Sequence, residues 1–264
     1  MSGKAALYVD GFNFYYGVTN HFRPFRERLG YSLSGLCWCD FRALVERNFG
    51  HTQLTAVKYF TAPVTTQVAR GEYPGEEGRY ALWRAALATI PGIRVIEGRY
   101  QPRGAECPIP GAPSHFREEK QSDVQLAIEM VIDAWEHGSN LEIQYLLTGD
   151  QDLWPAVWSC ILRAPQPMEV RILLPPNVKK ATALQQLQDC AARLAARQKA
   201  GERVLRRIES KLQLYELDEH WLVNALLPYE PAPGVSCPHY WRLHPAFLIK
   251  CCKPKYRPDR PRLT

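Results

Sequence analysis

The chain has 264 residues, 46% of them hydrophobic and 23% charged, with a mild net charge of +6; these are the values of an ordinary globular protein. This length can bury a substantial core, in one large domain or in one domain with an appendage. No stretch approaches the roughly 20 apolar residues that span a bilayer, which excludes a membrane protein. Asp10 and Asn13 interrupt any signal-peptide pattern, so we expect a cytoplasmic protein.

Strand-like and helix-like stretches alternate along the first two thirds of the chain. The predicted strands are residues 5–9, 56–60, 93–97, 143–147 and 170–174. The predicted helices are residues 41–49, 79–90, 122–137 and 153–162. The alternation indicates βαβ units and hence an α/β, Rossmann-like fold, with a mainly parallel sheet flanked by helices. The carboxyl ends of the strands then meet at one edge, where ligands of open sheets bind.

The composition changes after Pro175 and Pro176, where a long helix rich in Ala, Gln, Arg and Leu begins. An earlier segment rich in Pro and Gly, residues 99–114, indicates an exposed loop. We therefore predict one domain over residues 1–180 and a helical C-terminal extension with a basic, Pro-rich tail over residues 181–264.

Basic side chains gather in this extension. The helical part contains Lys179, Lys180, Arg193, Arg197, Lys199, Arg203, Arg206, Arg207 and Lys211. The tail contains Lys250, Lys253, Lys255, Arg257, Arg260 and Arg262. Such clusters suit a polyanion such as nucleic acid, and a solvated helix face with a frayed tail is the alternative. Leucines of the same helix (Leu184, Leu187, Leu194, Leu205 and Leu212) keep no strict heptad, so self-association into a homo-oligomer is an alternative role.

The eight cysteines have no framework spacing, so we expect reduced and mostly buried thiols. A zinc site made from Cys37, Cys39, Cys237 and His239 is the alternative. Paired zinc ligands more often have two residues between them, which favours the first interpretation.

Three acidic residues follow two of the predicted strands. Asp10 comes directly after the first strand, and Asp150 and Asp152 come after the fourth, where Thr148 and Gly149 make the turn. Parallel strands would bring all three acids to one edge of the sheet. Asp152 also lies at the start of the next helix, where an acid stabilises the helix dipole.

A fourth acid lies in the first turn of the helix SDVQLAIEMVIDAW. At about 100° per residue, Asp123 shares a face with Leu126 and Met130, whereas Glu129 and Glu136 lie on a separate polar stripe as ordinary surface charges. We therefore expect Asp123 to point toward the sheet. A half-buried carboxylate needs a partner or a cation, and hard cations such as Mg²⁺ or Mn²⁺ prefer oxygen ligands. Asp10, Asp123, Asp150 and Asp152 thus form a candidate metal cluster.

The segments YVDGFNFYYG, YFTAPV, EEKQSDVQLAIEMVIDAW and LLTGDQDLWPAV resemble, in this order, motifs of the NYN domain family (the LabA-like or DUF88 group) of the PIN-like nuclease superfamily. The resemblance covers about residues 4–178. It implies a PIN-like α/β fold and a metal-dependent ribonuclease. Gln125 stands where related sequences often have Asn, and Gln121-Ser122 replaces a more usual Gly-Thr or Gly-Ser; neither change removes an acid.

Carried over by residue, the resemblance places Asp10 and Asn13 in the first motif, and Asp123 with Lys120 beside it in the third. The fourth motif has Thr148, Asp150 and Asp152. Asp133 matches an acid near the end of the helix motif, and Arg79 resembles a basic position after the second strand.

The resulting hypothesis is a nuclease that hydrolyses phosphodiester bonds of RNA, single-stranded RNA above all. One or two Mg²⁺ or Mn²⁺ ions, held by the four aspartates, would activate a water molecule and stabilise the leaving oxygen. Asn13 and Thr148 would orient these ligands, while Lys120 and Arg79 would neutralise phosphate charge. Solvated surface is the alternative for both basic residues. Tyr15 and Tyr16 could stack on bases, or pack in the core.

Two alternatives come from other classes of protein. The first is a PIN-like module that binds RNA or a partner without catalysis. Such a module would lack some of the aspartates of the motifs, but this sequence has all of them. The second is a phosphohydrolase with Asp10 as a covalent nucleophile. Haloacid-dehalogenase enzymes place a second acid two residues later, where this chain has Phe12.

Overall fold

The computed structural model describes residues 4–30, 32–50, 53–64, 75–103, 116–136, 141–165, 168–198, 210–245 and 247. Its first half contains β1 (Lys4–Asp10), α1 (Gly11–Leu29), η1 (Ser34–Cys37), α2 (Phe41–Phe49), β2 (Gln53–Thr61), α3 (Glu76–Leu87), β3 (Ile93–Glu97), β4 (Arg99–Arg103) and β5 (Phe116–Lys120). Its second half contains α4 (Ser122–Glu136), β6 (Ile143–Leu147), η2 (Gln151–Leu153), α5 (Trp154–Arg163), β7 (Glu169–Leu174), α6 (Lys180–Gln198), β8 (Leu212–Glu216), α8 (Glu219–Val223) and η3 (His239–Trp241).

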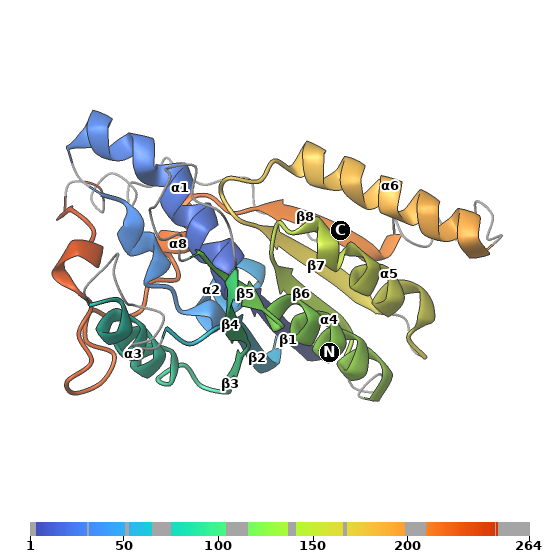
Figure 1. The fold of residues 1–264 in the computed structure, drawn as a ribbon, viewed down its shortest axis with the longest axis horizontal. Coiled ribbons are helices and arrows are strands. Elements are labelled where there is room, and N and C mark those ends of the chain that lie inside the picture. The colour runs from blue at the N-terminus through green and yellow to red at the C-terminus, as the bar shows by residue number, and fades with distance from the viewer. Residues whose placement is uncertain are drawn as a thin grey trace.

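A six-stranded sheet in the order β3-β2-β1-β6-β7-β8 forms the centre of the molecule (Figure 1). All neighbouring strands in it are parallel. The predicted α/β fold with a parallel sheet flanked by helices is therefore confirmed, and all five predicted strands belong to this sheet. The central strand β1 is buried on both faces, which explains why its sequence is continuously apolar instead of alternating.

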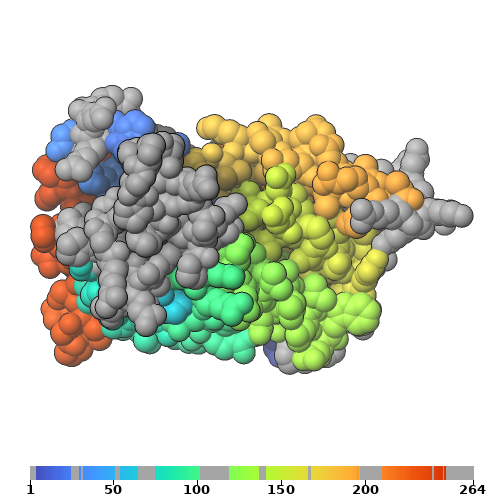
Figure 2. Space-filling model, in the orientation of Figure 1, coloured from blue at the N-terminus to red at the C-terminus, as the bar shows by residue number. Residues whose placement is uncertain are grey.

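Helices cover both faces of the sheet and make two hydrophobic cores. Leu7 and Val9 of β1 belong to the core on the side of α1, α2 and α8. Ala6 and Tyr8, which point the other way, belong to the core on the side of α4, α5 and α6. Figure 2 shows the green surface of α4 and α5 beside the yellow and orange surface of α6.

A separate antiparallel hairpin, β4–β5, lies between β3 and α4 in the chain. Gly98 lets β4 begin close to the backbone of β5, because a Cβ on this glycine would lie 2.6 Å from the carbonyl oxygen of Lys120. Gln121 then adopts a positive φ of 83°, and α4 starts at Ser122. The hairpin therefore holds the beginning of α4.

The chain after residue 180 contributes to the same sheet and core. α6 is helical as predicted, while β8 is a strand that the sequence analysis did not anticipate. Leu227, Leu243 and Phe247 are buried in the core that contains Trp38. Many of the basic residues predicted to contact nucleic acid, Lys199 to Arg207 and the tail after Ile249 among them, lie outside the described residues.

The described cysteines are free and buried; they are Cys37, Cys39, Cys160, Cys190 and Cys237. Cys107, Cys251 and Cys252 lie outside the described residues. In the part of the chain that the structure describes, no helix is long and apolar enough to cross a membrane.

Candidate functional site

The carboxyl ends of β1 and β6 lie side by side because these strands are parallel neighbours, with Val9 paired to Leu147. Asp10 ends β1 and is 7% exposed. The hydroxyl of the buried Thr148, which follows β6, donates a hydrogen bond of 2.8 Å to Oδ2 of Asp10. The prediction that these two segments meet at one edge of the sheet is confirmed.

Two further hydrogen bonds hold the backbone around this pair. The backbone N–H of Asn13 donates to Oδ1 of Asp10 at 2.9 Å, so both oxygens of the carboxyl group are bonded. The side-chain oxygen of Asn13 accepts from the backbone N–H of Gly149 at 2.7 Å. Asn13 therefore links the loop after β6 to the start of α1, and its predicted role in orienting ligands stays a prediction.

Glycine is required where the chain passes from β1 into α1. A Cβ on the buried Gly11 would lie 2.6 Å from the ring of Tyr59 and 2.7 Å from the backbone oxygen of Phe60. Real Cβ atoms essentially never come this close, so any larger residue at position 11 would clash with β2. Gly11 thereby allows Asp10 to lie at the end of a fully packed strand.

Asp150 and Asp152 lie in the turn after Thr148. The backbone N–H of Asp150 donates to the Thr148 hydroxyl oxygen at 3.0 Å, and that of Asp152 donates to Oδ1 of Asp150 at 2.9 Å. Asp150 is thus the N-cap of η2, which explains part of its placement structurally. Asp152 is exposed.

Asp123 lies in the first turn of α4, and its orientation differs from the prediction. Leu126 and Met130 are buried against the sheet as expected, but Asp123 is exposed. The expectation that Asp123 is covered by the sheet is therefore wrong, although its neighbour Ser122 in the same turn is buried. Partial burial of the carboxyl group, followed by the charges of Asp150 and Asp152, still raises the pKa of Asp123.

Glu119 is a fifth acid of the site, and the sequence analysis missed it. It lies on β5, four residues before Asp123, and its Oε1 is buried with no hydrogen-bond partner. Burial, and then the charges of Asp123 and Asp10, raise the pKa of Glu119 to about 8. Its position next to Lys120 in the EEK segment was the available signal, but only the hairpin shows that β5 ends beside the other acids.

Burial also has the largest effect on Asp10, whose pKa it raises to about 7. The hydrogen bonds from Asn13 and Thr148 lower this pKa, while the charges of Asp123 and Asp150 raise it. Hereafter the acidic site means Asp10, Glu119, Asp123, Asp150 and Asp152. It combines an internal carboxyl group that titrates near neutral pH with acids at the surface, an arrangement suited to proton transfer.

The described acidic side chains do not form a preformed metal site. Among the described residues, no three His, Cys, Asp or Glu side chains are grouped so that they could hold one. The metal-binding prediction is corrected accordingly, and no reaction step is derived through an ion. Mg²⁺ or Mn²⁺ as an added cofactor stays a prediction.

The remaining predicted residues have different surroundings. Lys120 ends β5 beside the acidic site, whereas Arg79 is exposed on α3; contact of either with a substrate stays a prediction. Asp133 lies away from the acidic site, ten residues after Asp123 on α4, or about 15 Å along the helix.

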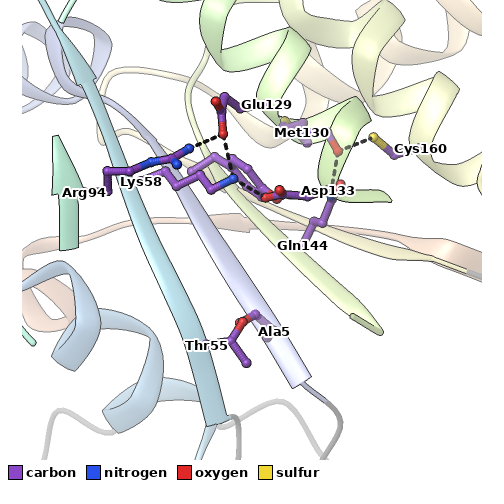
Figure 3. A network of polar contacts seen from close by, with 10 residues as sticks. Ala5, Thr55, Lys58, Arg94, Glu129, Met130, Asp133, Gln144 and Cys160 are labelled. Atoms are coloured by element: carbon purple, nitrogen blue, oxygen red, sulfur yellow. Dashed lines mark hydrogen bonds and ion pairs between the residues drawn. The ribbon is translucent and has the colours of Figure 1, made fainter. Parts of the chain in front are cut away.

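Asp133 belongs to a buried network between α4 and the sheet (Figure 3). Its Oδ2 accepts from Tyr8 Oη at 2.5 Å and from Lys58 Nζ at 2.5 Å. Lys58 also donates to Glu129 at 2.7 Å, and Glu129 in turn pairs with Arg94. Glu129 is therefore not the ordinary surface charge that the sequence predicted.

Sequence reasoning also missed Lys58, although a lysine within the apolar strand β2 was a signal. Its side chain is 9% exposed, and that of Asp133 is 10% exposed. A cavity of about 570 Å³ opens beside this network and is lined by Thr55, Lys58, Ile132 and Leu141 among others.

Comparison with known proteins gives one curated relative of interest. Over 212 residues, the chain is 27% identical to 6-hydroxy-3-succinoylpyridine 3-monooxygenase from Pseudomonas putida. The match covers 68% of this chain and 62% of the relative. No family model matches the chain. A Vibrio parahaemolyticus protein of unknown function has a crystal structure with a TM-score of 0.42 at 16% identity, covering 86% of this chain and 97% of that one; we draw no conclusion from this likeness.

The prediction of a metal-dependent ribonuclease is contradicted by this comparison, because the curated relative is a monooxygenase. The NYN resemblance and single-stranded RNA as a partner stay predictions.

Proposed function

We propose that this protein is an oxidoreductase of the monooxygenase type, with the acidic site as its active site. The observation that carries the proposal is the similarity to the pyridine monooxygenase, which extends over 212 residues. The acidic site supports it, because it lies at the carboxyl edge of a parallel sheet, where the ligands of open α/β folds bind.

Asp10 is the proposed acid–base group. Oxygen adds more readily to a hydroxylated aromatic ring when the ring hydroxyl has lost its proton, because the resulting oxyanion donates electron density to the ring. A carboxylate within a packed edge, held at both oxygens by Thr148 and Asn13, can accept this proton without reorienting. The neighbouring acids at the surface can pass it to solvent.

The overall reaction must balance oxygen and electrons. A monooxygenase places one atom of O₂ in its substrate and reduces the other to water with two electrons from a reductant. The substrate that we propose, by analogy with the name of the relative, is a hydroxylated nitrogen heterocycle. The two electrons would come from a reduced nicotinamide through a flavin, because a reduced nicotinamide alone does not react with O₂.

The finer assignment of the fold as PIN-like, within the NYN family, is also a proposal. The order of the four motifs supports it, as does the arrangement of Asp10 and Asp150 after neighbouring parallel strands. It is a proposal about the fold and carries no nuclease activity with it.

The test is oxygen uptake by the purified protein with 6-hydroxy-3-succinoylpyridine and NADH or NADPH, with and without added flavin, together with mass spectrometry of the product. We expect one atom of ¹⁸O from ¹⁸O₂ in the product. Asp10→Asn should lower the rate by about 10²-fold or more, which is typical of losing an acid–base group.

Asp189→Asn is the matched control, because Asp189 is an exposed aspartate on α6 that accepts a hydrogen bond from Gln185 one turn earlier. Its rate should equal that of the unaltered protein. Absence of labelled product from hydroxylated pyridines would overturn the proposed activity. Full activity of Asp10→Asn would overturn the role of Asp10.

A further inference from the structure

The outward face of α4 carries a row of exposed apolar side chains. Val124 is 61% exposed, Ile128 51% and Trp135 52%, and Val131 between them is partly exposed. At about 100° per residue, these four side chains lie within about 60° of one another around the helix. We call them the α4 seam. The helix that carries it belongs to the green surface in Figure 2.

The spacing within the α4 seam is typical of a helix that pairs with another helix. Its members follow one another at intervals of four, three and four residues, which are the intervals between the inner positions of a coiled coil. The contact of α4 with its own sheet uses other residues, Leu126, Met130 and Ala134, which are fully buried. The α4 seam is therefore a second apolar face, on the side of the helix opposite the sheet.

The α4 seam is complementary to itself in an antiparallel arrangement. A twofold axis between Ile128 and Val131 places Ile128 opposite the Val131 of a second copy. The same axis places Val124 opposite the Trp135 of that copy. The largest side chain of the seam thus meets one of the smallest, so the two helices can interlock, and each contact occurs twice by symmetry.

The charges of α4 also favour a second copy as the occupant. The helix has no lysine or arginine, whereas its acidic residues are Asp123, Glu129, Asp133 and Glu136. A helix that binds a membrane surface has Lys and Arg beside its apolar face, so a lipid surface does not fit. The positions that flank the seam are uncharged; they are Gln125, Ala127 and Ile132. Two copies can therefore approach without like charges meeting across the seam.

The area of the patch indicates a dimer of modest stability. Together with Ile132, which is also exposed, the α4 seam offers roughly 400 Å² of apolar surface per copy, within the range of patches that are often functional. Two copies would bury about 800 Å² from these residues, and the flanking residues bring the total toward the roughly 1,000 Å² of a specific interface. A dissociation constant on the order of 10 µM is therefore expected.

We propose that this protein forms a twofold dimer through the α4 seam, with the two copies of α4 packed antiparallel. Self-association is thereby located on α4 and not on the leucines of α6, where Leu187 is fully buried within its own chain. Because the seam begins one residue after Asp123, the second copy borders the acidic site. The dimer does not depend on the proposed activity.

Sedimentation velocity of the full chain from about 1 to about 200 µM measures the assembly, because a dimer of this affinity dissociates within that range. We expect a monomer at the low end and a dimer at the high end. Ile128→Asp should weaken dimerisation by at least about tenfold, since it places two charges against each other's apolar neighbours at the centre of the seam. Ile128 is half exposed, so the variant should keep the circular dichroism spectrum of the unaltered protein.

Leu184→Asp is the matched control, because Leu184 is an exposed leucine of α6, at 39%, and it tests the surface that the sequence suggested. It should dimerise as the unaltered protein does. Loss of the dimer in Leu184→Asp, or a full dimer in Ile128→Asp, would overturn the proposal. A protein that stays monomeric at every concentration would do the same, whether or not it sediments with phosphatidylglycerol vesicles.

The antiparallel arrangement has a test of its own. A mixture of Val124→Cys and Trp135→Cys variants should form a disulfide-linked dimer on mild oxidation, because positions 124 and 135 of different copies face each other. Val124→Cys alone should stay at the background of the native cysteines in the unaltered protein, since its two copies of position 124 lie about 17 Å apart along the seam. Efficient linking of Val124→Cys alone would show a parallel pair and overturn the proposed arrangement.

Discussion

Replacing Lys58 by Met should destabilise the protein by about 3 kcal/mol. Lys58 Nζ lies 2.5 Å from Asp133 and 2.7 Å from Glu129, and both Lys58 and Asp133 are about nine-tenths buried. Removing one partner of a buried ion pair costs about 3–5 kcal/mol, because the other charge stays buried without compensation. The low end applies here, since Tyr8 still donates to Asp133, and Glu129 is 28% exposed and keeps Arg94.

Urea unfolding followed by tryptophan fluorescence measures this loss as a shift of the midpoint. The double variant Lys58→Met with Asp133→Asn removes the uncompensated charge and keeps an oxygen that accepts from Tyr8, so it should recover at least half of the loss. Arg94→Met is the control: Arg94 is 57% exposed, and breaking such a pair costs less than about 1 kcal/mol.

The reasoning would be refuted by a Lys58→Met variant that unfolds within about 1 kcal/mol of the unaltered protein. It would be refuted equally by a double variant no more stable than the single one, because the uncompensated charge of Asp133 would then not be the cause.

Three further predictions concern other parts of the chain. The pKa of Asp10 is raised from 3.8 to about 7, so the folded state binds the proton of this carboxyl group more tightly than the unfolded state does. The stability gained from this proton is fully present below about pH 4. It is lost as the pH rises to 7, and the free energy of unfolding falls by up to about 4 kcal/mol. Asp10→Asn should lack this decline and be the more stable protein at pH 8, and parallel melting-temperature profiles from pH 4 to 8 would contradict the assignment. Gly11→Ala should lower stability by about 1–3 kcal/mol in thermal unfolding, because its Cβ would lie against the ring of Tyr59. Gly78→Ala, on the exposed face of α3 with open space around it, should instead be neutral or stabilising. An equal effect of both changes would argue against the clash. Burial raises the pKa of the fully buried Cys39 thiol, so iodoacetamide should label it, as mapped by mass spectrometry, only after unfolding; rapid labelling of the native protein would show that this core is open.

The sequence predicted the centre of the parallel sheet well because the inner strands β1 and β6 are buried on both faces. Runs such as Leu7 to Val9 and Leu146 to Leu147 are continuously apolar, a pattern with few alternative interpretations. The strand β8 has no such signal: it is an edge strand with one buried residue, Leu214, and its other side chains are at least partly exposed. Its pairing with β7 depends on the whole fold rather than on local sequence.

The site was predictable to the extent that it depends on strand ends. Asp10 and Thr148 meet because parallel neighbours end together, which needs no side-chain detail. Asp123 was misjudged because a helical projection treats every turn of a helix as equally covered, whereas Asp123 is exposed while Leu126 and Met130 on the same face are buried. Glu119 depends on a hairpin whose polar sequence resembles a loop.

β8 joins the sheet, and the segment around Trp241 joins the core near Trp38, only after the earlier elements have been made, which affects folding during synthesis on the ribosome. β1 leaves the ribosome well before β6, its partner on one side, which begins at Ile143. The indole N–H of Trp38 likewise finds its acceptor, the carbonyl oxygen of Pro228, only after about 190 more residues have been made. Most of the pairing is therefore long-range, which slows folding and prolongs the exposure of apolar strands. We expect a nascent chain stopped before residue 210 to be held by chaperones rather than to wait as a folded intermediate.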